Sequence, residues 1–305
     1  MGDADPVALA VRLGLYLVLG LAFGLPCFAL HSQADGDTVG LRKMLAAFAI
    51  GGLVLSAIGL VVLAASMAGT ALTAVDAAAC ASIMALPGIG AAWTARVAAL
   101  LLMLVSTATL RGTKTLAVAG TATGAIALAS LAWTGHGNSS EDAWSPVHLA
   151  ADVLHLLAAG AWLGALVGLW AMVARSARSA TPTQVSRTQA ALSGFAVIGS
   201  VIVGLIVVSG LVNSWTVIGL ANVPSLLTTL YGGLFLAKLA AFVAMLVLAT
   251  ANRFRLTPAL ERAVGQPSQQ LSALHTSLIV ETSAAVAIFA LVAWLGLLAP
   301  PGSMG

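Results

Sequence analysis

Charged side chains are scarce in this chain, and their scarcity excludes an ordinary soluble domain. Asp, Glu, Lys and Arg together make up 8% of the 305 residues, whereas hydrophobic residues make up 60%. Soluble globular domains typically contain roughly 25% charged residues. The composition therefore predicts an integral membrane protein whose main partner is the lipid bilayer.

Other absences exclude further classes of function. The two cysteines, Cys27 and Cys80, do not suggest a disulfide framework. The sequence has no GxxxxGK[ST] loop, so we expect no ATP bound by this chain, and it has neither a nucleophile elbow nor an HExxH helix to support hydrolysis. Membrane topology explains the formal net charge of +3, so no nucleic-acid partner is expected. We therefore expect this chain not to be an enzyme.

Long apolar runs predict an all-α integral membrane protein, a single polytopic domain over residues 1–305 with eight transmembrane helices. The first run is too long for a signal peptide and follows acidic residues, so we expect a retained span. Residues 69–90 are apolar but short, and they predict an interfacial or re-entrant helix between the second and third spans. A span needs about 20 residues, and suitable runs lie at approximately 7–30, 44–67, 91–110, 115–134, 147–173, 191–216, 229–250 and 271–298.

The distribution of basic residues predicts the orientation of these spans. Under alternating topology, Arg12, Arg96 and Lys238 lie near or within spans, and the other ten basic residues fall in loops on one side. Because cytoplasmic loops are enriched in Lys and Arg, both termini are expected on the outer side. The ten are Arg42, Lys43, Arg111, Lys114, Arg175, Arg178, Arg187, Arg253, Arg255 and Arg262.

The strongest candidate site lies between Trp133 and Gly164. On a helix, His148, Asp152 and His155 follow at i, i+4 and i+7 and share one face. His136 stands between two glycines, whose backbone freedom allows its ring to reach inward. Neutral imidazole is a ligand of copper, zinc and haem iron, so the pattern predicts an outward-facing metal site. The alternative is a set of interfacial polar residues satisfied by water and by one another.

Helix geometry limits how these side chains can share an ion. At about 1.5 Å per residue, His148 and His155 are roughly 10 Å apart along the axis. They are therefore not expected to bind one ion together closely. Instead, Asp152 is expected to pair with one of them, while His136 approaches from another side.

Two intramembrane charges are further candidates. Lys238 and Glu281 lie inside the seventh and eighth apolar runs, and opposite charges at membrane depth normally pair. The expected pair has two alternative roles, a structural salt bridge and a transport gate.

Sulfur-bearing side chains are weaker candidates for an ion path. Met67, Met84 and Met103 are expected on the outer half, where thioethers could bind Cu(I), although packing is the commoner role of methionine. Cys27 and His31 stand four residues apart at the inner end of the first span. This spacing suits a soft exit site, and coincidence explains it as well.

Several ordered motifs resemble the CopD (PcoD) family of copper-resistance membrane proteins. They extend from about residue 130 to 300, and the first four spans fit the family in length and placement. The motifs are GHG at 135–137, HLAADVLHLLAAGAWLGAL at 148–166, YGGLFLAKLAAF at 231–242, LATANRFRLTPAL at 248–260, and LHTSLIVETSAAVAIFALVAWLG in the last span.

The resemblance implies a bacterial inner-membrane protein of copper homeostasis. Such a protein would receive copper, as Cu(I) or Cu(II), from a periplasmic carrier of the CopC type and move it toward the cytoplasm. The positions that match the histidine-bearing motif of the family are His136, His148, Asp152 and His155. The direction of movement comes from the resemblance alone, since the residues themselves predict neither a direction nor an oligomeric state.

Two other classes of function stay open at this point. Helical membrane bundles use histidine pairs as haem ligands, so a haem-binding electron carrier or cupric reductase is an alternative. His31 and His275 would supply inner imidazoles, although position 275 departs from the family pattern. The second alternative is a structural membrane protein that only docks the periplasmic carrier.

Overall fold

The computed structural model describes residues 5–32, 37–134, 145–179, 181–220, 222–262 and 268–300, and all regular elements in these ranges are helical. Eight helices in the described ranges are long and apolar enough to cross a membrane, which confirms the predicted number. The main helices are α1 (Pro6–His31), α2 (Thr38–Ala68), α4 (Ile89–Thr109), α5 (Thr113–Ala129), α6 (Ser145–Ser179), α7 (Pro182–Ile218), α8 (Leu230–Ala251) and α10 (Ser268–Leu295).

Shorter elements connect these helices. The predicted short helix is present as α3 (Ala77–Met84), which packs against α2 and α4. Its interfacial or re-entrant position stays a prediction. The remaining elements are η1 (Leu72–Ala74), η2 (Ser130–Thr134), η4 (Val223–Leu227), a π-helical turn η5 (Asn252–Leu256) and α9 (Thr257–Arg262).

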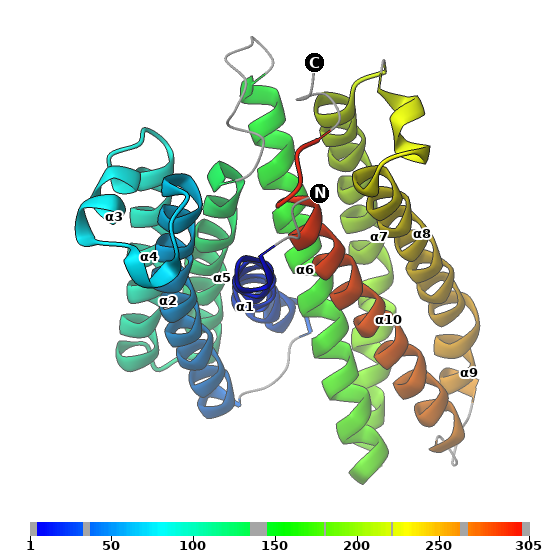
Figure 1. Cartoon of the computed structure of the whole chain (residues 1–305). Helices are drawn as coiled ribbons and strands as arrows, with labels where there is room; N and C mark the ends of the chain where they lie inside the picture. The colour runs from blue at the N-terminus through cyan, green and yellow to red at the C-terminus, as the bar shows by residue number, and fades with distance from the viewer. Residues whose placement is uncertain are drawn as a thin grey trace.

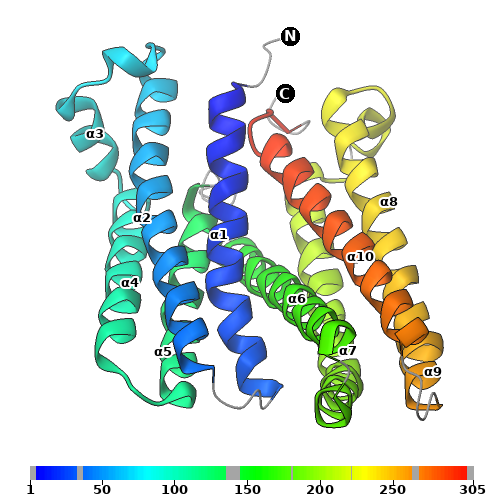
Figure 2. The same ribbon diagram turned by 90° about the horizontal axis from the view of Figure 1, so that it is seen from below.

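Helix α6 runs through the middle of the bundle. It contacts α1, α5, α7 and α10, with α2 to α5 on one side and α7, α8 and α10 on the other (Figure 1). The described ends of α1 and α10 nearest the termini lie at the same end of the bundle (Figure 2). We call this the histidine end, because α6 begins there with His148 in its first turns. We call the opposite end the basic end, because the ten basic residues expected in loops lie at its helix ends and connections.

Acidic and hydroxyl side chains start several of these helices. Asp5, Asp37 and Asp76 each accept a hydrogen bond, 2.8 or 2.9 Å long, from a backbone amide in the first turn of α1, α2 and α3. Thr229 does the same for α8 at 3.1 Å. Each cap satisfies an amide that lacks a partner within its helix, and losing one typically costs about 1 kcal/mol. Three of the ten acidic residues are thus explained by local structure.

Large apolar side chains cover the outside of the bundle. On α7, Val197, Val201, Val208 and Leu211 are each at least 59% exposed. Such a surface is unfavourable in water and favourable against lipid tails. Together with the eight apolar helices, it identifies a multi-pass membrane protein.

Glycine brings α1 and α6 into close contact. A Cβ on Gly164 would lie 2.1 Å from the backbone carbon of Gly24, and a Cβ on Gly24 would lie 2.1 Å from the carbonyl oxygen of Gly160. These distances are far shorter than any van der Waals contact, so the two backbones touch only because Gly24 and Gly164 lack a side chain. The small residues that follow His155 on α6 therefore serve helix packing, as expected for a membrane bundle.

Replacing Gly164 with Ala is expected to destabilise the bundle. The added methyl must push α1 away from α6, and overpacking of this kind costs about 1–3 kcal/mol. Thermal unfolding in detergent measures the loss. Gly204→Ala is the matched control, because a Cβ there meets no atom within 4 Å. Equal melting temperatures for the two variants would contradict the tight α1–α6 packing.

Candidate metal-binding cavity

Helix α6 presents the predicted polar face toward the interior of the bundle. His148, Asp152 and His155 lie on successive turns, and the His148 side chain is only 5% exposed. His136 lies outside the described residues. Three of the four predicted site residues can therefore be placed, and all three come from a single helix.

These three side chains line one cavity of about 160 Å³ at the histidine end, which we call the histidine cavity. Its walls come from α1, α6, α7, α8 and α10. The polar or charged side chains that line it are Arg12, Tyr16, His148, Asp152, His155, Asn213, Ser214, Tyr231 and Lys238. The predicted site residues thus share a common void, with charges of both signs around it.

Helix α7 supplies polar partners that sequence reasoning missed. Asn213 Nδ2 donates a 2.7 Å hydrogen bond to Asp152 Oδ1, and Ser209 Oγ lies 3.0 Å from His155 Nδ1. Ser209 and Asn213 stand four residues apart, so both face α6 from one side of α7. Two polar residues at helical spacing within a strongly apolar run are the signal that could have revealed them.

The contact with Ser209 orients the His155 ring. Because Ser209 bonds to Nδ1 of the ring, Nε2 is the nitrogen that stays available to a ligand in the cavity. Gly210 makes room for the ring, since a Cβ there would lie 3.3 Å from His155 Cε1. A hydrogen bond to one imidazole nitrogen commonly fixes the ring for metal binding through the other.

The histidines do not form a preassembled metal centre in the described part of the chain. No group of three or more His, Cys, Asp or Glu side chains within it is close enough to hold one ion. The seven-residue spacing of His148 and His155 keeps the rings on separate turns, as expected from helix geometry. Asp152 accepts a hydrogen bond from Asn213, and His155 Nδ1 contacts Ser209 Oγ. The pairing of Asp152 with a histidine stays a prediction.

Lys238 faces the site, and this corrects the expected Lys238–Glu281 pair. Lys238 lines the histidine cavity, where the Asp152 carboxylate exerts an attractive field on its ammonium group. Glu281 instead accepts a hydrogen bond from Asn252, which follows Lys238 by fourteen residues, or about 21 Å, along α8. The structure does not bring the two charges together, because they lie at different depths of the bundle.

Helix α1 contributes a second cation. Arg12 Nη1 donates a 2.6 Å hydrogen bond to the carbonyl oxygen of Gly296, just beyond the end of α10, and Arg12 Nε contacts the Tyr16 hydroxyl at 3.4 Å. A carbonyl at the C-terminal end of a helix has no partner within that helix, and a cation there is stabilised by the helix dipole. Arg12 therefore joins α1 to α10 and forms part of the cavity wall.

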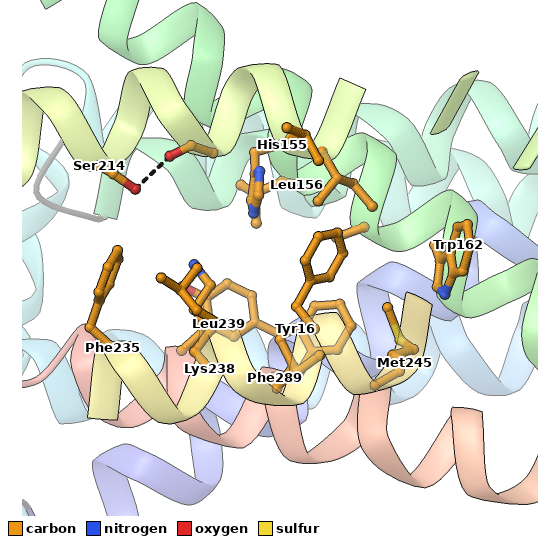
Figure 3. A pocket seen from close by; sticks show the side chains of 18 of the residues that line it. Tyr16, His155, Leu156, Trp162, Ser214, Phe235, Lys238, Leu239, Met245 and Phe289 are labelled. Atoms are coloured by element: carbon orange, nitrogen blue, oxygen red, sulfur yellow. Dashed lines mark hydrogen bonds between the residues drawn. The ribbon is translucent and has the colours of Figure 1, made fainter. Parts of the chain in front are cut away.

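A second void, the central cavity, continues from the first toward the middle of the bundle. It measures about 360 Å³, and Tyr16, His155 and Lys238 line both cavities. His155 extends into it from α6, opposite Lys238 on α8, with Tyr16 and Phe289 nearby (Figure 3). Its walls are otherwise almost entirely apolar, so these few polar groups dominate its electrostatics.

The sulfur-bearing candidates are dispersed. Met67 is 59% exposed at the end of α2, and Met84 ends α3. Met103 is fully buried against Leu45 and Leu116, which lie near the starts of α2 and α5 and hence toward the basic end. This corrects its expected position on the outer half, and its described surroundings are an apolar core.

Cys27 and His31 lie together on the wall of a separate cavity. This cavity, of about 540 Å³ at the basic end, is also lined by Arg187. His275 lies elsewhere, with its ring 6.1 Å from that of Trp170. The two inner-end imidazoles therefore occupy different surroundings, and no contact between them supports a shared haem.

The fold and cavity define a multi-pass membrane protein with an imidazole- and carboxylate-lined void at one end. Two family models match the chain, "Copper resistance protein D-like, N-terminal domain" over residues 1–147 and "Copper resistance protein D" over residues 189–295. The chain belongs to the copper resistance protein D family, as the motifs predicted, and this membership indicates a role in copper resistance or homeostasis.

Curated relatives agree with this assignment. The chain is 39% identical over 311 aligned residues, 99% of each chain, to copper resistance protein D of Pseudomonas syringae pv. tomato. It is 33% identical over 131 residues, 42% of each chain, to inner membrane protein YebZ of Escherichia coli K12. No solved structure matches the chain.

The Asp152–Asn213 hydrogen bond is expected to stabilise the α6–α7 contact. A double-mutant cycle with Asp152→Ala and Asn213→Ala, followed by unfolding in mixed micelles, measures its coupling energy. Hydrogen bonds between membrane helices average about 0.6 kcal/mol and reach about 1.7 kcal/mol, and the charged acceptor places this one in the upper part of that range. Additive effects of the two substitutions would contradict a direct bond.

Proposed function

We propose that this chain transports copper across the bacterial inner membrane and captures the ion in the histidine cavity. The observation that carries the proposal is that His148, Asp152 and His155 line one void, although they lie on separate turns of α6. His136 would complete the set from the preceding segment. Neutral imidazoles and a carboxylate suit copper in either Cu(I) or Cu(II) form, with imidazole the better ligand for the softer ion.

The charge distribution supports an outward-facing capture site. The ten basic residues expected in cytoplasmic loops belong to the helix ends and connections of the basic end. By the positive-inside rule that end faces the cytoplasm, so the histidine cavity opens toward the periplasm. A periplasmic carrier of the CopC type, as the family resemblance implies, would deliver copper there.

The two joined cavities support a stepwise path inward. An ion held by His148 and Asp152 would pass to His155, whose ring also lines the central cavity. Exchange between neighbouring ligands avoids a naked ion in apolar surroundings, which would be very costly. Asp152 offsets the repulsion between the ion and Lys238. The path involves no covalent turnover, and its direction is toward the cytoplasm.

Removing either cavity histidine is expected to weaken copper binding by at least about tenfold, since even the loss of an outer-shell partner costs 10–100-fold in metal affinity. Competition with a copper-chelating dye in detergent measures the affinity of His148→Ala and His155→Ala. His275→Ala is the matched control, because that ring packs against Trp170 instead of the cavity. Wild-type affinity should also fall between about pH 7.5 and about pH 5.5, because protonated imidazole cannot ligate a metal.

Two results, one from this measurement and one from a visible spectrum, would overturn imidazole capture of copper. The first is an affinity that neither histidine substitution nor acidification changes. The second is a Soret band in the visible spectrum of the purified protein, which would favour a haem-binding electron carrier.

Copper accumulation in cells tests transport itself. Bacteria that express the wild-type chain should accumulate more copper than cells with the empty vector. The His148→Ala/His155→Ala double variant should lose this increase at equal expression, whereas His275→Ala should retain it. A double variant that accumulates copper like wild type would favour a protein that only docks the periplasmic carrier.

A further inference from the structure

Glu281 is a carboxyl group buried within the membrane-spanning part of α10. Its side chain is only 2% exposed, and its Oε1 accepts a hydrogen bond from Nδ2 of Asn252, which is 8% exposed. A carboxylate buried at membrane depth is costly, and such residues normally mark ion or proton pathways. Glu281 lies far from the histidine cavity, so copper capture does not explain it.

The backbone beside Glu281 is also unusual. Asn252 begins the π-helical turn Asn252–Leu256, where α8 widens before α9. Such turns within helices frequently occur at functional sites. The Asn252 carbonyl oxygen, Oδ1, is buried without a hydrogen-bond partner among the described residues. The Asn252 amide therefore donates to the Glu281 carboxyl group through Nδ2, while its buried Oδ1 lacks a donor among the described residues. A proton on the carboxyl group could supply that donor.

Glu281 and Asn252 line a cavity of about 550 Å³ between α6, α7, α8 and α10, which we call the glutamate cavity. Among its described lining residues, the charged side chains are Glu281 and Arg253. Arg253 is exposed, and its Nη1 donates a 2.6 Å hydrogen bond to Ser200 Oγ. The contributions of α6 are the apolar or aromatic Trp162, Leu166 and Leu169, and those of α7 are serines and apolar residues.

Trp162 connects this region to the copper path. It lines both the central cavity and the glutamate cavity, so the two voids adjoin at its side chain. A cation that has passed His155 thus approaches Glu281 through the interior of the bundle. Its positive charge would favour the ionised carboxylate and the release of a proton.

We propose that Glu281 is a proton-exchange site whose proton is released as copper moves through the bundle, so that copper and protons move in opposite directions. The exchange is a single proton transfer. A hydronium ion in the glutamate cavity gives its proton to Oε2 and leaves water and a neutral carboxylic acid, and the reverse step restores the carboxylate. Asn252 positions the carboxyl group in both states. This inference rests on the proposed copper transport and names its coupling ion.

Infrared difference spectroscopy of the purified protein tests the proton site without copper. Lowering the pH should produce a protonated-carboxyl band that is absent in Glu281→Gln, since glutamine keeps a similar shape and can still bond to Asn252 but cannot exchange a carboxyl proton. Asp76→Asn is the matched control, because Asp76 is an exposed helix cap and asparagine caps as well. The assignment would be overturned if the band persisted in Glu281→Gln, or if Asp76→Asn also lost it.

Vesicles containing the purified protein test coupling. With a pH-sensitive dye and a copper chelator inside, copper uptake by wild type should be accompanied by proton movement in the opposite direction. Glu281→Gln should bind copper with wild-type affinity in detergent but lose the proton signal, and its copper uptake should no longer respond to an imposed pH gradient. Asn252→Ala should reduce both responses.

The vesicle results separate the two proposals. A wild-type protein that moves no copper would overturn the proposed function, whatever the infrared band shows. A wild type that moves copper without protons would overturn only the coupling, and so would a well-folded Glu281→Gln protein that keeps the proton signal.

Discussion

The rest of this structure depends on one constraint: a polar group inside a membrane bundle must find its partner within the protein. Arg96, which is 3% exposed, donates to Ser130 across the α4–η2 contact. Asp152 accepts from Asn213 across α6 and α7, and Glu281 accepts from Asn252 across α10 and η5. Each of these bonds joins two elements, so satisfying the polar groups also fixes which helices lie side by side.

The same constraint explains where chemistry is possible. Apolar packing fills most of the bundle, and α1 and α6 touch directly where Gly24 meets Gly164. Voids remain where polar side chains of several helices meet, at the histidine cavity and at the glutamate cavity. The mainly apolar central cavity lies between them and contacts both through His155 and Trp162. The proposed path for copper therefore consists of polar positions separated by apolar walls.

Sequence spacing predicted which side chains share one face of a helix. The sequence did not predict which side chains of different helices meet. His148, Asp152 and His155 share a face because the helical repeat requires it, and that face lines the predicted cavity. Lys238 and Glu281 were matched only by opposite charge, and they lie at different depths. Met103 was assigned to the wrong half although the predicted span 91–110 already places it past the midpoint, toward the basic end.

The sequence by itself determined the membrane class, the eight spans, the polar face of α6 and the family. Composition and helical periodicity are local properties, and hydrophobic length alone decides whether a segment can cross a bilayer. Only the tertiary structure decided that Ser209 and Asn213 meet α6, that Arg12 holds the end of α10, and that Glu281 pairs with Asn252. Those pairings depend on the rotation and depth of whole helices, which arise from the packing of all of them together.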